Sequence, residues 1–155
     1  AAHIVSRARY HGGERGFSSS PRAAGYGMMS YQQAQQAGDR TLVMCQIESV
    51  DGLANAEAIA AVPGVDGLFV GRADLALSMG ETGSRSPKVL DATQRILKAA
   101  TDAGKIAAMF VAGNAEREEF AALGASWFIV GSDQSLLRQA AQVIASSTTP
   151  RARRS

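Results

Sequence analysis

The decisive stretch of this sequence is Thr41-Leu-Val-Met-Cys-Gln-Ile47, together with the second run Gly67-Leu-Phe-Val70. Short apolar runs rich in β-branched residues, with helical sequence between them, are typical of buried parallel strands. The segment over residues 51–62 is rich in alanine and ends at Pro63-Gly64, so it is predicted to be the crossover helix. The two runs and this helix form one βαβ unit.

Acidic residues follow both predicted strands: Glu48 comes directly after the first, and Asp74 comes shortly after the second. Because the carboxyl ends of parallel strands meet at one edge of the sheet, the two carboxylates are expected to share one space. Two hard oxygen ligands without a histidine or cysteine partner suit Mg²⁺ or Mn²⁺ better than a structural zinc. Taken alone, Glu48 also fits a helix N-terminal charge, and Asp74 also fits a helix cap.

The remaining sequence alternates between strand-like and helix-like segments. Before the βαβ unit we predict the end of a helix over residues 1–10, a loop over 11–27, and a helix over 31–37 that is capped by Ser30 and stopped by Gly38. After it we predict a short helix over 73–79, a helix from Ser86-Pro87 to residue 103 and a strand over 105–111. The last predicted elements are a helix over 115–123 capped by Asn114, a strand over 125–130, and a helix to residue 145 capped by Asp133. The charged run Glu116-Arg-Glu-Glu119 is predicted to face water.

Four strands, each followed by a helix, make this an α/β protein with about four βα units. That is half of a TIM (β/α)8 barrel, which takes eight units. Residues 1–145 are predicted to form this partial barrel domain, and residues 146–155 a disordered basic tail. A half barrel leaves two open sheet edges and an apolar inner face uncovered, so a stable monomer is not expected.

Composition narrows the function classes. Apolar residues make up 46% and charged residues 19%, as in globular proteins. The net charge of +2 depends on Arg151, Arg153 and Arg154 in the tail, so the rest of the chain carries about −1 (2 minus 3). We therefore expect no nucleic-acid partner. No signal peptide or long apolar span appears, which favours a cytoplasmic protein without a membrane partner. The single cysteine, Cys45, is predicted to be buried in its strand.

Two motifs lie in this region: Gln46-Ile47-Glu48, and Gly71-Arg-Ala-Asp-Leu75 with Met79-Gly80 behind it. They resemble motifs of the HpcH/HpaI aldolase/citrate lyase family, in particular of its metal-dependent pyruvate aldolases. The second motif usually reads Gly-Pro-Ala-Asp-Leu in the family, so an arginine, Arg72, stands here in place of proline. The separation of 26 positions between the two acids (74 minus 48) also fits the family. The resemblance covers nearly the whole chain and implies strands five to eight of a TIM barrel.

The resemblance implies a reaction and a role for each motif residue. The reaction is reversible cleavage of a 4-hydroxy-2-keto acid to pyruvate and an aldehyde through a metal-bound enolate. By resemblance, Glu48 and Asp74 hold Mg²⁺ or Mn²⁺, with Co²⁺ a further candidate, and Gln46 contacts the substrate. The backbone N–H groups around Ala73 and Asp74 face the pyruvate carboxylate, and Phe110 shapes the aldehyde pocket. The resemblance also implies a homo-oligomer.

Two further groups of the family mechanism are expected in the other half of the barrel: a histidine that acts as base and an arginine that polarises the keto oxygen. Neither His3 nor His11 matches that histidine motif, and His11 has no visible carboxylate partner in the sequence. No catalytic residue is therefore assigned. General acid/base groups contribute roughly 10²–10⁴-fold each, so this chain alone is expected to turn over slowly, if at all.

Two alternatives stay open at this point. The first is a citrate-lyase-like or malyl-CoA-lyase-like enzyme that acts on a CoA thioester. It would need a basic groove for the CoA phosphates, and Arg72, Arg15 and Arg22 are the candidates near the strand ends. The second is an inactive half-barrel oligomer with vestigial ligands.

Overall fold

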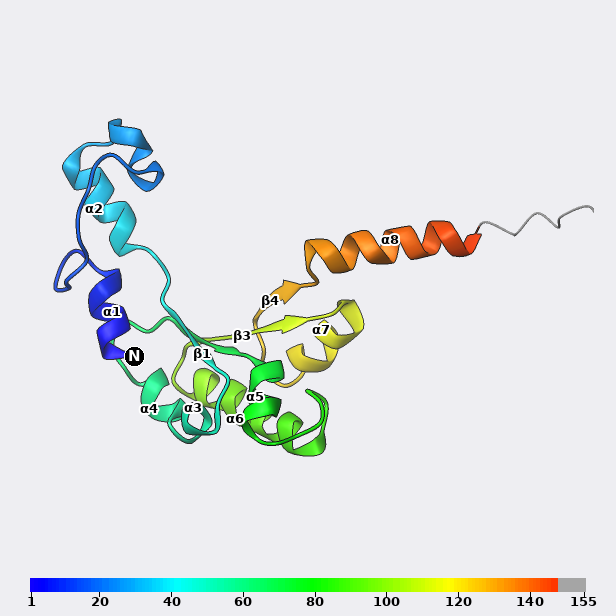
Figure 1. Cartoon of the computed structure of the whole chain (residues 1–155). Helices are drawn as coiled ribbons and strands as arrows, with labels where there is room; N and C mark the ends of the chain where they lie inside the picture. The colour runs from blue at the N-terminus through cyan, green and yellow to red at the C-terminus, as the bar shows by residue number, and fades with distance from the viewer. Residues whose placement is uncertain (148–155) are drawn as a thin grey trace, which may run out of the picture.

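A four-stranded parallel sheet organises the computed structural model, which describes residues 1–147 (Figure 1). Its strands are β1 (Met44–Ile47), β2 (Gly67–Val70), β3 (Ile106–Val111) and β4 (Trp127–Val130), paired in sequence order. All four predicted strands are confirmed, although β1 begins three residues later than its apolar run. Consecutive parallel strands with helical crossovers confirm the α/β class and the half-barrel topology.

The strand register separates a covered face of the sheet from an open one. Ile47 pairs with Val70, and Val70 pairs with Met109; all three are buried beneath the helices. The alternate positions lie on the opposite face, where Phe110 and Trp127 remain 41% and 47% exposed. The apolar inner face of the half barrel is therefore uncovered, as the sequence predicted.

The first crossover contains two short helices, α3 (Val50–Ala54) and α4 (Ala56–Ala60), where one helix was predicted. The break lies at Asn55, whose side-chain amide donates to the backbone carbonyl of Asp51 at 2.8 Å. An asparagine side chain that bonds to the local backbone competes with the helical hydrogen bonds, which explains the interruption. The prediction of one continuous helix over residues 51–62 is wrong at this residue.

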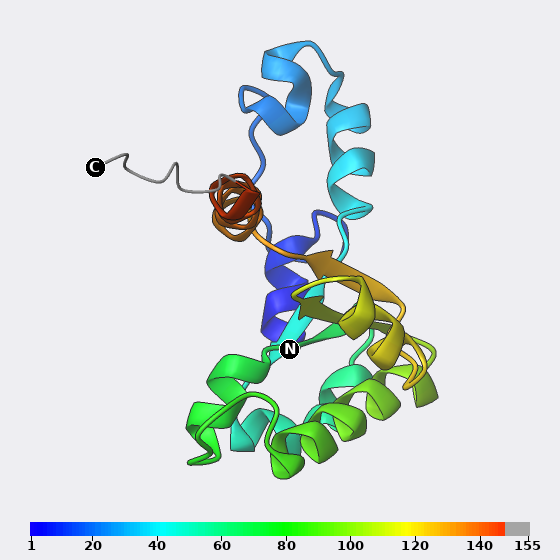
Figure 2. The same cartoon turned by 90° about the vertical axis from the view of Figure 1, so that its right-hand side faces the viewer.

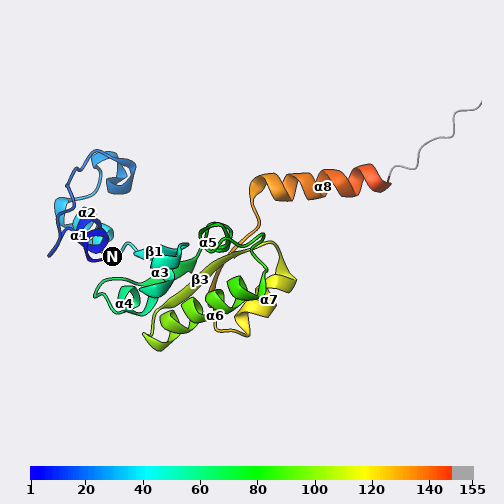
Figure 3. The ribbon, with the colours of Figure 1, turned by 60° about the horizontal axis from the view of Figure 1, so that its bottom comes forward.

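The longest crossover helix, α6 (Pro87–Asp102), matches its prediction closely. Ser86 caps it by accepting the N–H of Val89 at 3.3 Å, and Pro87 occupies the first helical position. Ile96 and Leu97 are fully buried against the sheet. In Figure 3, α6 lies with α3 and α4 across the same side of the strands. Cys45 belongs to this core, as predicted.

Three helices follow the later strands: α5 (Arg72–Ser78) after β2, α7 (Asn114–Ala121) after β3 and α8 (Asp133–Ser147) after β4. Two predicted caps are wrong by one residue. Gly113 holds the cap position of α7, so Asn114 is already helical. Ser132 accepts the N–H of Ser135 at 3.2 Å at the start of α8, whereas Asp133 is its first helical residue.

Helix α8 projects away from the sheet (Figures 1 and 3). It also ends beyond its predicted boundary. It continues through Ser147, so the first two residues of the predicted disordered tail are helical. The rest of that tail, residues 148–155, lies outside the described residues. Among residues 1–147, no helix combines the length and the apolar character that crossing a membrane requires.

The N-terminal segment forms a separate arm beside the amino end of the sheet (Figure 2). It contains α1 (Ala2–Ala8), the 3-10 helix η1 (Arg22–Gly27) and α2 (Tyr31–Asp39). Ser30 caps α2 as predicted, in a reciprocal capping box with Gln33. Helix α2 continues through Gly38, which was predicted to stop it.

Candidate functional site

An open pocket of about 410 Å³ lies at the carboxyl ends of β1, β2 and β3. We call it the strand-end pocket. The residues that line it are Gln46, Phe69, Val70, Gly71, Arg72, Ala73, Asp74, Ser84, Arg85, Phe110, Ala112 and Glu116. This is the edge at which parallel α/β sheets place their ligands.

Four of the five predicted site residues line this pocket: Gln46, Ala73, Asp74 and Phe110. The fifth, Glu48, is half buried beside it, and its Oε2 accepts a hydrogen bond from the side-chain amide of Gln46. Since Gln46 is itself a lining residue, Glu48 belongs to the same edge of the sheet. The structure thus brings together the residues that the two motifs supplied separately.

Gly71 makes room for Glu48 at this edge. Its backbone N–H donates to the carbonyl of Ile47 at 3.0 Å, so the end of β2 lies directly against the end of β1. A Cβ atom at position 71 would lie 2.8 Å from the Cβ of Glu48 and 2.9 Å from Nε2 of Gln46. Only glycine allows this approach without a shift of those side chains. The sequence motif includes Gly71, but the structure gives the reason for a glycine there, which is the close contact between the ends of β1 and β2.

The donor set at this edge fits a hard divalent cation. Glu48 and Asp74 supply carboxylates, and among residues 1–147 no group of three or more histidine, cysteine or acidic side chains converges on one point. Mg²⁺ typically uses one or two carboxylates and keeps several waters or substrate oxygens as its other ligands. Two carboxylates beside an open pocket meet that requirement, whereas a structural zinc site would need four protein ligands.

The prediction that the charged run of α7 faces water is wrong for Glu116, whereas Arg117, Glu118 and Glu119 are exposed as predicted. Glu116 does not face water: its side chain is 16% exposed, and its Oε1 lies 2.7 Å from Nη2 of Arg72. Arg72 is 9% exposed and also donates to the carbonyl oxygen of Phe110 at 3.3 Å. The physical reason is that the turn after β2 and the first turn of α7 face each other across the pocket, which no spacing within α7 reveals.

Glu116 contacts several members of a larger charged cluster. Arg85 lies 3.1 Å from Oε1 of Glu116 and 2.9 Å from Glu119. The backbone N–H of Ala112 donates to Oε2 of Glu116 at 2.7 Å. Burial disfavours the charge on Glu116, but the Ala112 N–H, Arg72 and Arg85 together outweigh burial and lower its pKa. The hydrogen bonds and charge of Glu119 raise the pKa of Arg85. Sequence reasoning missed Arg85 and Glu116, since their partners are distant in the chain.

The histidines lie elsewhere, in the N-terminal arm. Nδ1 of His11 pairs with Oδ2 of Asp39, which corrects the expectation that His11 has no carboxylate partner. That hydrogen bond is the main cause of a lowered pKa for Asp39. His3 accepts from Arg7 at 3.3 Å on the exposed side of α1. Neither histidine lines the strand-end pocket.

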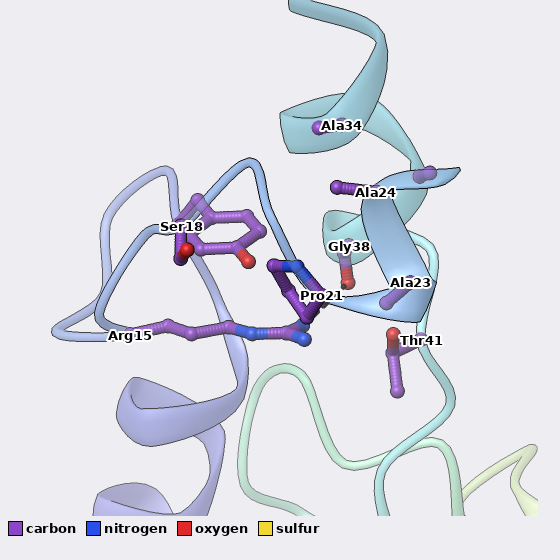
Figure 4. Close-up of a pocket in the computed structure, with 10 residues that line it drawn as sticks. Arg15, Ser18, Pro21, Ala23, Ala24, Ala34, Gly38 and Thr41 are labelled. Carbon is purple, nitrogen blue, oxygen red and sulfur yellow. Dashed lines mark hydrogen bonds between the residues drawn. The ribbon is translucent and has the colours of Figure 1, made fainter. Parts of the chain in front are cut away.

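A second, smaller cavity of about 120 Å³ lies within the arm (Figure 4). Arg15 extends across it toward Pro21 and donates to the carbonyl of Gly38 at 3.3 Å. Its guanidinium also lies 4.6 Å from the centre of the Tyr10 ring. Among the described residues that line this cavity, none carries a carboxylate and none is a predicted site residue. We interpret it as a packing gap between η1 and α2.

Comparison with known proteins gives consistent matches. A model of the family described as HpcH/HpaI aldolase/citrate lyase matches residues 1–140. A 5-keto-4-deoxy-D-glucarate aldolase from Shigella dysenteriae serotype 1 (strain Sd197) is 40% identical over 147 residues, which are 94% of this chain and 57% of that protein. The chain therefore spans little more than half the length of this relative.

Solved structures share the fold over the same extent. A crystal structure of an HpcH/HpaI family protein from Burkholderia cenocepacia J2315 is 37% identical, with a TM-score of 0.84, and the match covers 94% of this chain and 59% of that one. The citrate synthase SbnG is 27% identical, with a TM-score of 0.76, and the match covers 94% of this chain and 57% of that one. Both matches are partial in the relative and nearly complete in this chain.

Proposed function

This chain belongs to the HpcH/HpaI aldolase/citrate lyase family, and from that premise we propose that its strand-end pocket serves a divalent-metal-dependent aldolase. The proposed reaction cleaves a 4-hydroxy-2-keto acid reversibly into pyruvate and an aldehyde. The similar protein from Shigella carries the name of an aldolase that acts on a keto-deoxy sugar acid, which supports this reaction class. Because the chain spans little more than half of that relative, the proposal for this chain alone is a metal-binding and pyruvate-binding half-site.

The observation that carries the proposal is the convergence at one sheet edge. Gln46 on β1, Asp74 in the first turn of α5 after β2, and Phe110 on β3 line one pocket, and Glu48 bonds to Gln46 beside it. Mg²⁺ or Mn²⁺ held by Glu48 and Asp74 would stabilise the negative charge that develops on the keto oxygen of the substrate.

The chain's own residues have distinct tasks in this proposal. Gln46 orients the carboxylate of Glu48 through the bond to its Oε2 and presents its amide to the substrate. The first turn of α5 has no side-chain cap, so the backbone N–H groups at Ala73 and Asp74 can bind the pyruvate carboxylate. Phe110, half exposed at the end of β3, provides an apolar wall for the aldehyde.

Cleavage breaks the bond between C3 and C4 of the substrate, while the 4-hydroxyl loses a proton and C3 of pyruvate gains one. His3 and His11, the two histidines of the chain, lie outside the pocket, so neither is proposed as the base. The resemblance assigns the base and the arginine that polarises the keto oxygen to the other half of the barrel. We therefore propose slow turnover at best by this chain alone.

The CoA-thioester alternative is less well supported. Arg72, the basic candidate nearest the strand ends, is paired with Glu116 and buried. Arg15 bonds to backbone carbonyls beside the separate cavity in the arm. The third candidate, Arg22, lies in η1 of the arm, and Arg85, which lines the pocket, is paired with Glu116 and Glu119. Both arginines that line the strand-end pocket are therefore paired with carboxylates, and we expect no saturable acetyl-CoA binding.

The test is pyruvate release from a 4-hydroxy-2-keto acid, measured by coupled lactate dehydrogenase with and without Mn²⁺. Activity that needs Mn²⁺ and falls by about 10²-fold or more in Glu48→Ala and Asp74→Ala would support the proposal, since each substitution removes a metal ligand. Asp91→Ala is a control, because Asp91 is exposed and lines a different pocket. Unchanged rates in both ligand variants would overturn the aldolase proposal. A folded chain that ignores millimolar Mn²⁺ would support an inactive half-barrel oligomer.

We also propose a homo-oligomer and a cytoplasmic location. The open inner face and the exposed apolar side chains of α8 support the homo-oligomer, since large exposed apolar surfaces mark association sites. The cytoplasmic location stays a prediction from the sequence.

A further inference from the structure

We propose that Arg72 is a specificity-determining positioning residue of the strand-end pocket. It ties the turn that carries Asp74 to the wall that carries Phe110, and thereby sets the size of aldehyde that fits between them. The inference rests on the proposed function, because it concerns the second substrate of that same reaction.

One side chain joins three elements here. Arg72 is the first residue of α5, and Asp74 lies in the same helical turn. Its Nη2 donates both to the carbonyl of Phe110 at 3.3 Å, on β3, and to Glu116 at 2.7 Å, on α7. Its guanidinium carbon lies 4.6 Å from the centre of the buried Phe120 ring. A displacement of Arg72 would therefore be felt on both walls of the pocket.

The burial of Arg72 is costly, which argues for a role beyond fold stability. Arginine is rarely buried to this extent, and Nη1 of Arg72 has no hydrogen-bond partner among residues 1–147. A buried ion pair is often no more stabilising than apolar side chains of similar volume, and an unpaired donor adds a penalty. The planar guanidinium supplies a fixed direction instead, because Nη2 alone donates to two acceptors, the carbonyl of Phe110 and the carboxylate of Glu116.

The backbone position of Arg72 supports the same conclusion. It is the first helical position of α5, where proline is favoured because its ring fixes φ. Arginine leaves φ free, so the turn before Asp74 must be held by tertiary contacts instead. The bonds of Arg72 to Phe110 and Glu116 provide that restraint.

The cluster selects by shape and not by charge. The two guanidiniums of Arg72 and Arg85 are matched by the two carboxylates of Glu116 and Glu119, all within hydrogen-bonding distance of a partner. Their charges therefore cancel, and this side of the pocket has little net attraction for an anionic aldehyde. We expect discrimination to follow the length of a neutral aldehyde, because the separation between the Asp74 turn and Phe110 sets the available space.

The first experiment measures aldol addition of pyruvate to propanal and to pentanal with Mn²⁺. The enzymes are the wild-type chain, Arg72→Lys, Arg72→Pro and the control Lys98→Ala, whose residue forms an exposed pair with Asp102. In both Arg72 variants the ratio of kcat/KM for the two aldehydes should change by about tenfold or more, because shape discrimination in a pocket has that size. The control should leave the ratio unchanged. An equal loss of rate for both aldehydes would overturn the inference, since a merely structural residue acts in that way.

A second measurement separates this inference from the proposed function. A wild-type chain that binds neither Mn²⁺ nor pyruvate would contradict the proposed function, and amide chemical shifts decide the role of Arg72 whether or not turnover is seen. Arg72→Lys should shift the amide signals of residues 110–112 on β3 as well as those of Ala73 and Asp74. Lys98→Ala should shift neither group. Changes confined to residues 71–76 would show that Arg72 does not couple the two walls, and the inference would be wrong.

Discussion

Gly71 shows how a single residue sets the geometry of the strand-end pocket. The chain departs from β2 at this point, and the missing side chain leaves space that Glu48 and Gln46 fill. Its φ of −92° is open to any residue, so the need for glycine comes from the neighbouring strand and not from its own backbone. The residue is therefore explained by tertiary contact.

We predict that Gly71→Ala weakens Mn²⁺ binding by about tenfold or more, a typical effect of displacing a group that orients a metal ligand. The new Cβ would lie 2.8 Å from the Cβ of Glu48, which has little freedom to move. Isothermal titration with Mn²⁺ measures the change. Gly83→Ala is the matched control, because nothing lies within 4 Å of its Cβ position. Equal affinities in the two variants would contradict a metal site beside Glu48.

Glu116 leads to a prediction about pH. Its pKa is lowered below the ordinary value of 4.5, because the Ala112 N–H, Arg72 and Arg85 outweigh the opposing effect of burial. A lowered pKa in the folded state means that ionised Glu116 stabilises the fold above pH 4.5, and that this stability is lost as the pH falls through the lowered pKa. The free energy of unfolding, from urea titrations, should therefore decrease below that pH.

The variant Glu116→Gln tests this assignment. It removes the titrating group while keeping the side-chain shape, so the decrease of stability in acid should become shallower than in the wild type. Glu57→Gln, on the exposed side of α4, serves as the control. An identical acid dependence in Glu116→Gln and wild type would show that Glu116 does not contribute.

At the scale of whole elements, the sheet and its crossover helices follow local rules, while the N-terminal arm depends on a few long-range bonds. Arg9 donates to the carbonyl oxygens of Thr41 and Gly64 and lies 3.2 Å from Asp66. Asp66 also accepts the N–H of Val43 at 2.7 Å. These bonds fasten the arm to the amino end of the sheet.

We predict that Arg9→Ala frees the arm while leaving the sheet folded. Residues 1–39 should then exchange their amide hydrogens faster and be cut sooner by trypsin, because the arm makes few other contacts with the sheet. Mass spectrometry of exchanged and digested protein measures both effects. Arg7→Ala is the control, since its pair with Glu14 is exposed on both sides. Equal protection of the arm in the two variants would contradict the role of Arg9.

At the scale of the whole molecule, the half barrel leaves one face of its sheet open to solvent. The helices bury one face of the sheet, but Ile129 and Trp127 of β4 remain about half exposed on the other face. Leu136, Leu137 and Val143 of α8 are exposed as well. Apolar surface of this extent favours burial against another polypeptide, since each buried Å² contributes roughly 25 cal/mol.

The single tryptophan allows a direct test of this proposal. We predict that its fluorescence shifts to the blue as the protein concentration rises, because association removes Trp127 from water. Ile129→Asp should prevent both the shift and the increase in mass seen by light scattering. Leu77→Asp, at an exposed position of α5, should leave association intact. A monomer at all concentrations, with constant fluorescence, would contradict a homo-oligomer.

Much of the fold was predictable because it follows local patterns. The apolar runs ending at Ile47 and Val70, the cap at Ser86 and the capping box at Ser30 all have their causes within a few residues. The break at Asn55 was not predicted, since asparagine is tolerated in helices until its side chain bonds to the backbone. The predicted caps of α7 and α8 were each wrong by one residue: Gly113 precedes the first helical residue of α7 without a side-chain cap, and Ser132 in place of Asp133 accepts the N–H of Ser135 at α8.

The sequence by itself determined the class of fold, the order of the strands and the two acidic motifs at their ends, because strand alternation and motif residues are local properties of the chain. Only the tertiary structure decided that Arg72 turns inward to Glu116 and Phe110, and that Gly71 makes room for Glu48. These contacts join residues far apart in the chain. Their energies depend on burial and on distances across the pocket, and no local pattern encodes either quantity.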